Sequence, residues 1–287
     1  MQRSSMPYDP AIYSGCAEHY LRGRPPYSHD LAPALAARLG TLVGGQLLDV
    51  GAGTGAVAHA LRTLFSRIVA VEPDHGMVSA GMAWARSEGL TQLSYLHARA
   101  EMLGELELGH FELVTFGQSF HWTSRDAVAA LAFARVLPGG GIALITHQHA
   151  GRPQPAGPGA PLIPHEAVHA LIRRYLGPAR RAGNGLAPVL PGFDEKAVLA
   201  GAGFIDIKRL YCPGRTDLVR DVDAVVSNFL SMSFAAPPLF GDRLDDFCTE
   251  LRALLLDASP GGEFWDWPGD TEVVFARKPS AQSLRAH

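Results

Sequence analysis

Short apolar runs alternate with longer amphipathic stretches through the first half of the chain. The apolar runs favour strands at 46–50, 67–72, 93–98, 111–116 and 141–146. The amphipathic stretches predict helices near 30–40, 55–65, 75–88 and 124–136, the last one ended by the sequence PGGG. Strands and helices in alternation are typical of an α/β protein with a parallel sheet covered on both faces.

The pattern changes after a segment rich in proline and glycine, residues 149–164. Helical patterns follow near 165–176, 221–232 and 242–257, and two more strands are expected at 204–212 and 271–278. We expect these two strands to complete a doubly wound, mostly parallel sheet of seven strands, with the last strand reversed. The later helices are then expected to fold over the rim of the sheet as cap insertions.

Composition and charge narrow the functional classes. The 287 residues are 47% hydrophobic, enough for a sizeable core, and the net charge of -3 gives no general reason to expect nucleic acid or an anionic membrane as partner. The three cysteines are far apart and indicate neither disulfides nor a zinc site. No signal peptide or membrane span is evident, so we expect a cytoplasmic monomer or homodimer with a small-molecule substrate.

A glycine-rich loop, LLDVGAGTGA, joins the first predicted strand to a helix. Gly51, Gly53 and Gly55 allow a tight turn and a close approach of a ligand to the backbone. Glu72 ends the next strand about twenty residues later, where a carboxylate can accept hydrogen bonds from both ribose hydroxyls. The glycines lack the G-x-G-x-x-G spacing of dinucleotide sites, and Asp49 suits a ligand that is cationic at this point. A nucleoside ligand with a cationic end is predicted.

With its other motifs the sequence resembles the class I S-adenosylmethionine-dependent methyltransferases, in particular small-molecule members of the trans-aconitate and ubiquinone-biosynthesis type. The similar segments are YLRGRPPY, LLDVGAGTGA, VAVEPDHGMV, ARAEML, FELVTFGQSFHW and LPGGGIALI, within about residues 8–146. The resemblance implies a Rossmann-like fold, S-adenosylmethionine as cofactor and S-adenosylhomocysteine as product. The cofactor-binding residues that it implies are Tyr20, Arg24, Asp49, Gly51, Gly53, Gly55, Glu72, Pro73, Met77, Ala100, Glu101 and Gln118. Arg99 stands where the family normally has an acidic residue, so Ala100 and Glu101 are expected to make the adenine contact.

The same resemblance suggests how the chain is divided. Lid helices are expected over 1–40, and the cofactor-binding core over 41–149. The helical cap over the substrate pocket is expected to comprise 150–192 and 213–262, and the strands that complete the core 193–212 and 263–287.

The stretch FGQSFHW follows the fourth predicted strand, at the edge where open α/β sheets bind ligands. Gln118 is expected near the methionine part of the cofactor, with His121 and Trp122 facing the substrate. His121 is the candidate catalytic base, because an imidazole titrates near neutral pH; the alternative is a hydrogen bond to the cap. Trp122 is expected to be a wall of the substrate pocket or part of the packing.

Four other residues are candidates for substrate binding. His147 and His149 alternate at the end of the fifth predicted strand and so point the same way. They lack a carboxylate as third ligand, and no metal is predicted. Arg173 and Arg174 form a candidate cationic patch over the mouth of the pocket, or else belong to an ordinary solvated helix face.

These residues predict methyl transfer to a small, anionic acceptor in specialised or secondary metabolism. A carboxylate acceptor would need no base. The carbon of a prenyl diphosphate would use cations for the diphosphate, aromatic faces for a carbocation and a base for the final proton. Two other functions stay open: binding of S-adenosylmethionine without methyl transfer and, disfavoured by the glycine spacing, NAD(P)-dependent oxidation and reduction.

Overall fold

The computed structural model describes residues 13–148, 157–179, 181–182, 185–186 and 194–280. Seven strands form one sheet in the order β3-β2-β1-β4-β5-β11-β8. They are β1 (Gln46–Val50), β2 (Arg67–Glu72), β3 (Leu93–His97), β4 (Phe111–Gly117), β5 (Val136–Gln148), β8 (Ile205–Cys212) and β11 (Asp270–Arg277). Strand β11 runs antiparallel to both of its neighbours, and the pairs among β1 to β5 are parallel. The predicted Rossmann-like sheet with a reversed last strand is confirmed.

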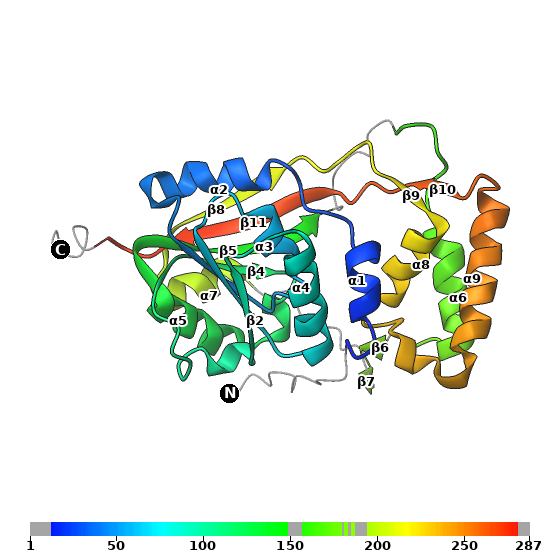
Figure 1. Ribbon diagram of the computed structural model, residues 1–287, viewed down its shortest axis with the longest axis horizontal. Coiled ribbons are helices and arrows are strands. Elements are labelled where there is room, and N and C mark those ends of the chain that lie inside the picture. Colours follow the sequence, from blue (N-terminus) through cyan, green and yellow to red (C-terminus); the bar gives the residue numbers. More distant parts are fainter. Residues whose placement is uncertain (1–12, 149–156, 180, 183–184, 187–193, 281–287) are drawn as a thin grey trace.

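Helices cover both faces of this sheet. They are α2 (Leu31–Leu39), α3 (Ala56–Ala60), α4 (His75–Ser87), α5 (Arg125–Arg135) and α7 (Glu195–Gly201). Successive residues of β1 point to opposite faces, so Leu47 packs with α2 and α3 while Leu48 packs with α5 and α7. Accordingly, α2 and α5 lie on opposite sides of the sheet (Figure 1).

A second group of helices lies beyond α1 (Ala17–Gly23), at the far end of the molecule from α2 and α5 (Figure 1). We call this group the cap: α6 (His165–Leu176), α8 (Val222–Leu230) and α9 (Leu244–Ala258), with strands β9 (Val219–Asp221) and β10 (Glu263–Trp265). Another short pair, β6 (Arg181–Ala182) and β7 (Gly185–Leu186), forms a separate two-stranded sheet. Phe229, Phe247 and Phe264 are fully buried in a hydrophobic core that the cap helices share. The cap therefore has a core of its own, distinct from the two cores on the faces of the sheet.

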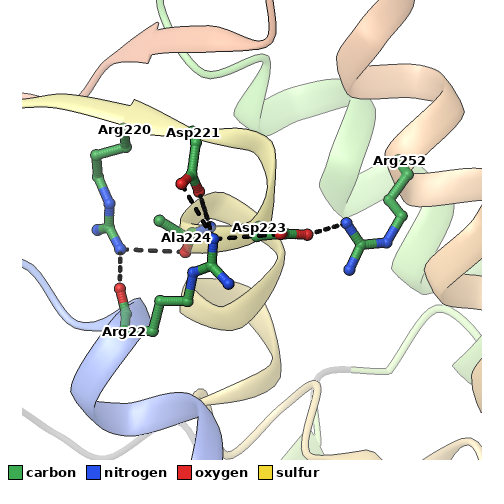
Figure 2. A network of polar contacts seen from close by, with 6 residues as sticks. All are labelled: Arg22, Arg220, Asp221, Asp223, Ala224 and Arg252. Carbon is green, nitrogen blue, oxygen red and sulfur yellow. Dashed lines mark hydrogen bonds and ion pairs between the residues drawn. The ribbon is translucent and has the colours of Figure 1, made fainter.

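Helix α1 is fastened to the cap rather than to the sheet. A Cβ atom on Gly23 would lie 2.4 Å from the backbone of Ser227, so only glycine allows this close packing of α1 on α8. Arg22 on α1 forms ion pairs with Asp221 and Asp223, and Asp223 is also paired with Arg252 of α9 (Figure 2).

Several local predictions were wrong. Helix α3 ends at Ala60 instead of 65, and β5 begins at Val136, so the PGGG sequence lies inside the strand instead of stopping a helix. Glycine suits this part of β5, because a Cβ on Gly140 would lie 2.6 Å from the carbonyl oxygen of Glu112. Helix α7 was not predicted; its first turn is capped by the Asp194 carboxylate, which accepts two backbone hydrogen bonds.

The segment that precedes β11 also differs from expectation. Residues 263–265 were assigned to the strands completing the core, but as β10 they pair with β9 of the cap. The large sheet is joined only from Asp270 onward.

Candidate active site

A cavity of about 1310 Å³ lies between the carboxyl ends of the core strands and the cap. Sites for one small ligand usually measure about 300–1,000 Å³, so this cavity has room for a cofactor and an acceptor together. Predicted site residues that line it are Tyr20, Arg24, Asp49, Gly51, Gly53, Glu72, Pro73, Met77, Ala100, Glu101, Gln118, His121, Trp122 and His147. Residues from distant parts of the sequence thus meet around one space.

The glycine loop after β1 has the backbone that its sequence requires. Gly51, Gly53 and Gly55 have φ values of 65°, 56° and 93°, in the left-handed region that favours glycine. A Cβ on Gly51 would lie 2.5 Å from the Cβ of Ser119, which closes that position to larger residues. Gly51 and Gly53 line the cavity, whereas Gly55 precedes α3 and packs on Tyr95, so it shapes the turn without lining the cavity.

Glu72, at the end of β2, holds this loop in place. Its Oε2 accepts a hydrogen bond from the Gly53 N–H at 2.8 Å, and its Oε1 accepts one from the Asp74 N–H at 2.9 Å. Burial raises the pKa of the Glu72 carboxyl to about 7, and the backbone hydrogen bonds oppose that rise. Each carboxylate oxygen can accept a further bond, so Glu72 can also bind a ligand in the cavity.

Asp49 is fully buried at the base of the cavity. Its Oδ1 accepts a hydrogen bond from the Thr115 hydroxyl at 2.8 Å, while its Oδ2 has no hydrogen-bond partner among the described residues. Burial raises the pKa of Asp49 to about 7, opposed by the hydrogen bond from Thr115 and by the nearby backbone N–H of Ala58, which lies outside hydrogen-bond geometry to Oδ2. A buried carboxylate with an unused oxygen is suited to a cationic partner.

Helix α1 and the residue that follows it cover the loop from the other side. The Tyr20 ring lies 3.7 Å from where a Cβ on Gly53 would be, and the Arg24 guanidinium lies 4.6 Å from the centre of that ring. Arg24 donates hydrogen bonds to the Tyr20 hydroxyl and, at 2.8 Å, to the carbonyl oxygen of Ser231 that follows α8. The lid residues therefore connect the glycine loop to the cap.

The stretch after β4 forms the wall next to the lid. Gln118 has φ = 54°, uncommon outside glycine, and its backbone N–H donates to Ile145. His121 and Trp122 follow in a short 3-10 helix, with the Trp122 ring 6.2 Å from Tyr13 in an edge-to-face arrangement. Burial, with a contribution from Arg125, lowers the pKa of His121 to about 4. This shift argues against an imidazole that titrates near neutral pH, and the role of His121 as a catalytic base stays a prediction.

Glu101, one of the residues predicted to contact the adenine, already interacts with other residues of the protein. Arg99 and Glu101 form an ion pair at 3.5 Å, and both line the cavity. The Glu101 Oε1 also accepts a hydrogen bond from the backbone N–H of Ser124, just before α5. The positive charge of Arg99 is thus balanced locally by the neighbouring carboxylate.

The candidate substrate residues fall into three groups. His147 lines the cavity and stacks on Tyr27, with ring centres 4.9 Å apart. His149 lies outside the described residues. Arg173 and Arg174 are exposed on α6 and do not line the cavity; Arg174 pairs instead with Glu250 of α9. Their prediction as substrate-binding residues is corrected: they occupy the solvated face of an amphipathic helix.

The cavity also has lining residues that were not identified from the sequence. They are aromatic or amide side chains: Tyr13, Tyr27, Phe234, Trp265, Trp267 and Asn228. The sequence FWDWP, with two tryptophans close together, was a visible signal for part of this wall. Asn228 gave none, because a single asparagine in a helix is uninformative until the partners of that helix are known.

Within the described ranges, no group of three or more His, Cys, Asp or Glu side chains could hold a metal ion. None of the helices there is long and apolar enough to cross a membrane.

The match to known families agrees with this geometry. Residues 48–145, from β1 to β5, match the family described as Methyltransferase domain. This is a class I S-adenosylmethionine-dependent methyltransferase domain. S-adenosylmethionine is the cofactor of the methyltransferase, as predicted, and a buried carboxylate facing a glycine loop with open backbone fits its charge.

Solved structures show how widely this fold is used. The 4+2 cyclase SpnF is 16% identical to the methyltransferase, with 97% of this chain and 100% of that chain covered and a TM-score of 0.53. A proposed type II methyltransferase from Anaeromyxobacter dehalogenans is 20% identical, with 89% and 99% covered and a TM-score of 0.50. At these identities the likeness concerns the fold alone, and SpnF is a cyclase. No curated protein matches the sequence.

Proposed function

We propose that the protein transfers the methyl group of S-adenosylmethionine to a small molecule held between the core and the cap. The observation that carries this proposal is one continuous cavity, with the glycine loop and two buried carboxylates at one end and cap residues at the other. A role in specialised or secondary metabolism and a cytoplasmic location belong to the same proposal.

We assign the core end of the cavity to the cofactor. Glu72 binds the ribose, Asp49 faces the ammonium group of the methionine part, and Pro73 and Met77 border the adenine. When bound, S-adenosylmethionine supplies an electrophilic methyl group: the bond from sulfur to methyl breaks as the bond to the acceptor forms, and S-adenosylhomocysteine remains. The protein's part in such a displacement is to bring the acceptor in line at close range.

His121 is assigned to positioning the acceptor, not to general base catalysis. With its pKa lowered to about 4 it is neutral at pH 7, where it can donate or accept a hydrogen bond but is a weak base. This favours an acceptor whose attacking atom needs no base from the protein. It weighs against the prenyl diphosphate mechanism, which needs one.

The positions of the arginine side chains also weaken the case for an anionic acceptor. Arg173 and Arg174, which were expected to provide positive charge at the mouth, lie outside the cavity. The guanidinium of Arg99 is paired with Glu101. Arg24 donates to Tyr20 and Ser231, but its Nε has no hydrogen-bond partner among the described residues, and we assign its positive charge to the cofactor end of the cavity. We therefore retain a small-molecule acceptor and drop the requirement for a negative charge.

The test begins with calorimetric titration of the protein with S-adenosylmethionine, S-adenosylhomocysteine, NADH and NADPH. Micromolar binding of the two sulfur nucleosides alone is expected, followed by transfer of a labelled methyl group when candidate acceptors are added. Binding of NADH or NADPH instead would contradict the proposal. Tight cofactor binding without transfer to any acceptor would favour a non-catalytic role. With a true acceptor, the pH profile of turnover near pH 6.5 should have the same shape in His121→Asn as in the unaltered protein.

A further inference from the structure

The cap side of the cavity is mainly apolar. The described residues that line it come from the cap and from the segments next to its helices and strands, and we call them the cap wall: Leu162, Ile163, His165, Asn228, Met232, Ser233, Phe234, Trp265, Asp266, Trp267 and Pro268. Leu162 is 50% exposed although it is a large hydrophobic residue, so it offers apolar surface to a ligand. Such a wall, with three aromatic rings, is suited to a flat apolar molecule.

The charge on this wall is already neutralised. Asp266 is the only carboxylate or guanidinium among the described cap residues that line the cavity. It is buried and paired with Arg220 at 2.9 Å. Arg220 in turn donates to the carbonyl oxygens of Arg22, Gly23 and Ala224, two of which are drawn in Figure 2. The donors of Arg220 and the charge of Asp266 are thus used within the protein, which leaves little to attract a charged acceptor.

One polar side chain on the wall is different. Asn228 on α8 is 4% exposed and lines the cavity, yet its Oδ1 has no hydrogen-bond partner among the described residues. A buried amide oxygen without a partner is costly, and such groups are normally satisfied by protein, water or a ligand. Because an amide presents both a donor and an acceptor, a hydroxyl group can pair with it in either orientation.

We propose that the cap side of the cavity binds an uncharged aromatic acceptor that carries a hydroxyl group, with this hydroxyl hydrogen-bonded to Asn228. The inference rests on the proposed function, since it names the class of molecule that receives the methyl group; the hydroxyl is its binding contact, and the attacking atom is a different one that needs no base from the protein. The inference excludes carboxylates and phosphates as preferred acceptors, because the described cap wall offers them no unpaired guanidinium.

Two matched probes test the inference: 2-naphthol and 2-naphthoate, titrated calorimetrically into the protein saturated with S-adenosylhomocysteine. Naphthol should bind about tenfold more tightly than naphthoate, because a carboxylate loses hydration on this wall without gaining a cationic partner. Asn228→Leu should weaken naphthol binding about fivefold to tenfold and leave the affinity for S-adenosylhomocysteine unchanged. Thr249→Leu, a polar-to-apolar change on the exposed face of α9 outside the cavity, is the control and should have no such effect.

A second variant serves if Asn228→Leu does not fold. Asn228→Asp keeps an acceptor for the hydroxyl, so naphthol binding should persist while naphthoate binding falls further. Naphthoate binding as tight as naphthol, failure of naphthol to bind, or naphthol binding that ignores the Asn228→Leu change would each overturn the inference. Provided S-adenosylhomocysteine still binds, those outcomes leave the proposed function intact. Failure of S-adenosylhomocysteine to bind the unaltered protein would instead reject the proposed function itself.

Discussion

The two ends of the cavity are built in opposite ways. The core end consists of loops that each follow a strand of one sheet, and its decisive residues lie within 49–122 of the sequence. The cap end combines α1, α6, α8 and the segment after β10, which are brought together only by tertiary packing. One end is specified by local backbone geometry and the other by contacts between distant segments.

The two ends of the cavity also differ in whether their buried charged groups form ion pairs. At the core end, Asp49 and Glu72 are buried carboxyls without an ion pair to a basic residue in the described structure, and burial raises the pKa of both. At the cap end, the buried Asp266 is matched by Arg220. The core end therefore has carboxyl groups that can pair with a cationic ligand. At the cap end, the buried charge is already neutralised by an ion pair within the protein.

The largest expected effect concerns the buried pair of the cap. Asp266→Ala leaves the buried Arg220 guanidinium without its carboxylate, and should lower the free energy of unfolding by about 3–5 kcal/mol, measured in urea. Asp223→Ala is the matched control, because it breaks the half-exposed pairs with Arg22 and Arg252 shown in Figure 2. That change should cost about 0.5 kcal/mol or less. Equal effects of the two substitutions would mean that the cap does not depend on its buried pair.

A smaller loss is expected from the glycine loop of the core. Gly51→Ala combines a strained positive φ with a contact of 2.5 Å to the Ser119 side chain, and should cost about 3 kcal/mol of unfolding free energy. It should also abolish calorimetrically detectable cofactor binding. Gly89→Ala separates the two causes, because Gly89 has a similar φ of 67° with nothing near its added Cβ. The control should cost about 1 kcal/mol and spare cofactor binding; if it costs as much as Gly51→Ala, crowding against Ser119 is unimportant.

The difference between the two ends of the cavity explains which parts of the site could be predicted from the sequence. The strands of the large sheet, the glycine loop and Glu72 were predicted because each depends on residues close together in the chain. Apolar runs of strand length, positive φ at glycine and a carboxylate at the end of a strand are local features. The core end of the site could therefore be assigned residue by residue.

The cap end of the cavity could not be assigned from the sequence, because tertiary packing decides which of its residues face the cavity. Arg174 and Asn228 both lie on amphipathic helices, and which of them faces the cavity depends on how α6 and α8 pack on α9 and α1. Sequence periodicity identifies a polar face of a helix but not what that face meets. The same limit applies to β10, whose pairing with β9 depends on a partner more than forty residues away. The shifted pKa of His121 likewise arises from burial, which the residue type alone does not reveal.

The third effect has the opposite sign and concerns Asp49. Its pKa is raised from 3.8 to about 7, so the folded protein retains a proton that the unfolded chain has lost. The contribution of Asp49 to stability therefore falls as pH rises from about 4 to about 7, and is constant above that range. Asp49→Asn removes this cost, and because a rise in pKa from 3.8 to about 7 corresponds to about 4 kcal/mol, the ligand-free variant should be more stable than the unaltered protein by up to about 4 kcal/mol at pH 8.

Urea unfolding between pH 3.5 and pH 8 checks this expectation, with the difference between the two proteins vanishing at the acidic end. Because Glu72 is present in both proteins, its own titration largely cancels in the comparison. Affinity for S-adenosylmethionine should fall about tenfold or more in the same variant, since the ammonium group loses a buried anion. If the variant is no more stable at pH 8, or if it binds the cofactor normally, then Asp49 is not a destabilising carboxyl that pairs with the positive charge of the cofactor. A gain in stability joined to a loss of binding would show that the core end gives up stability for function.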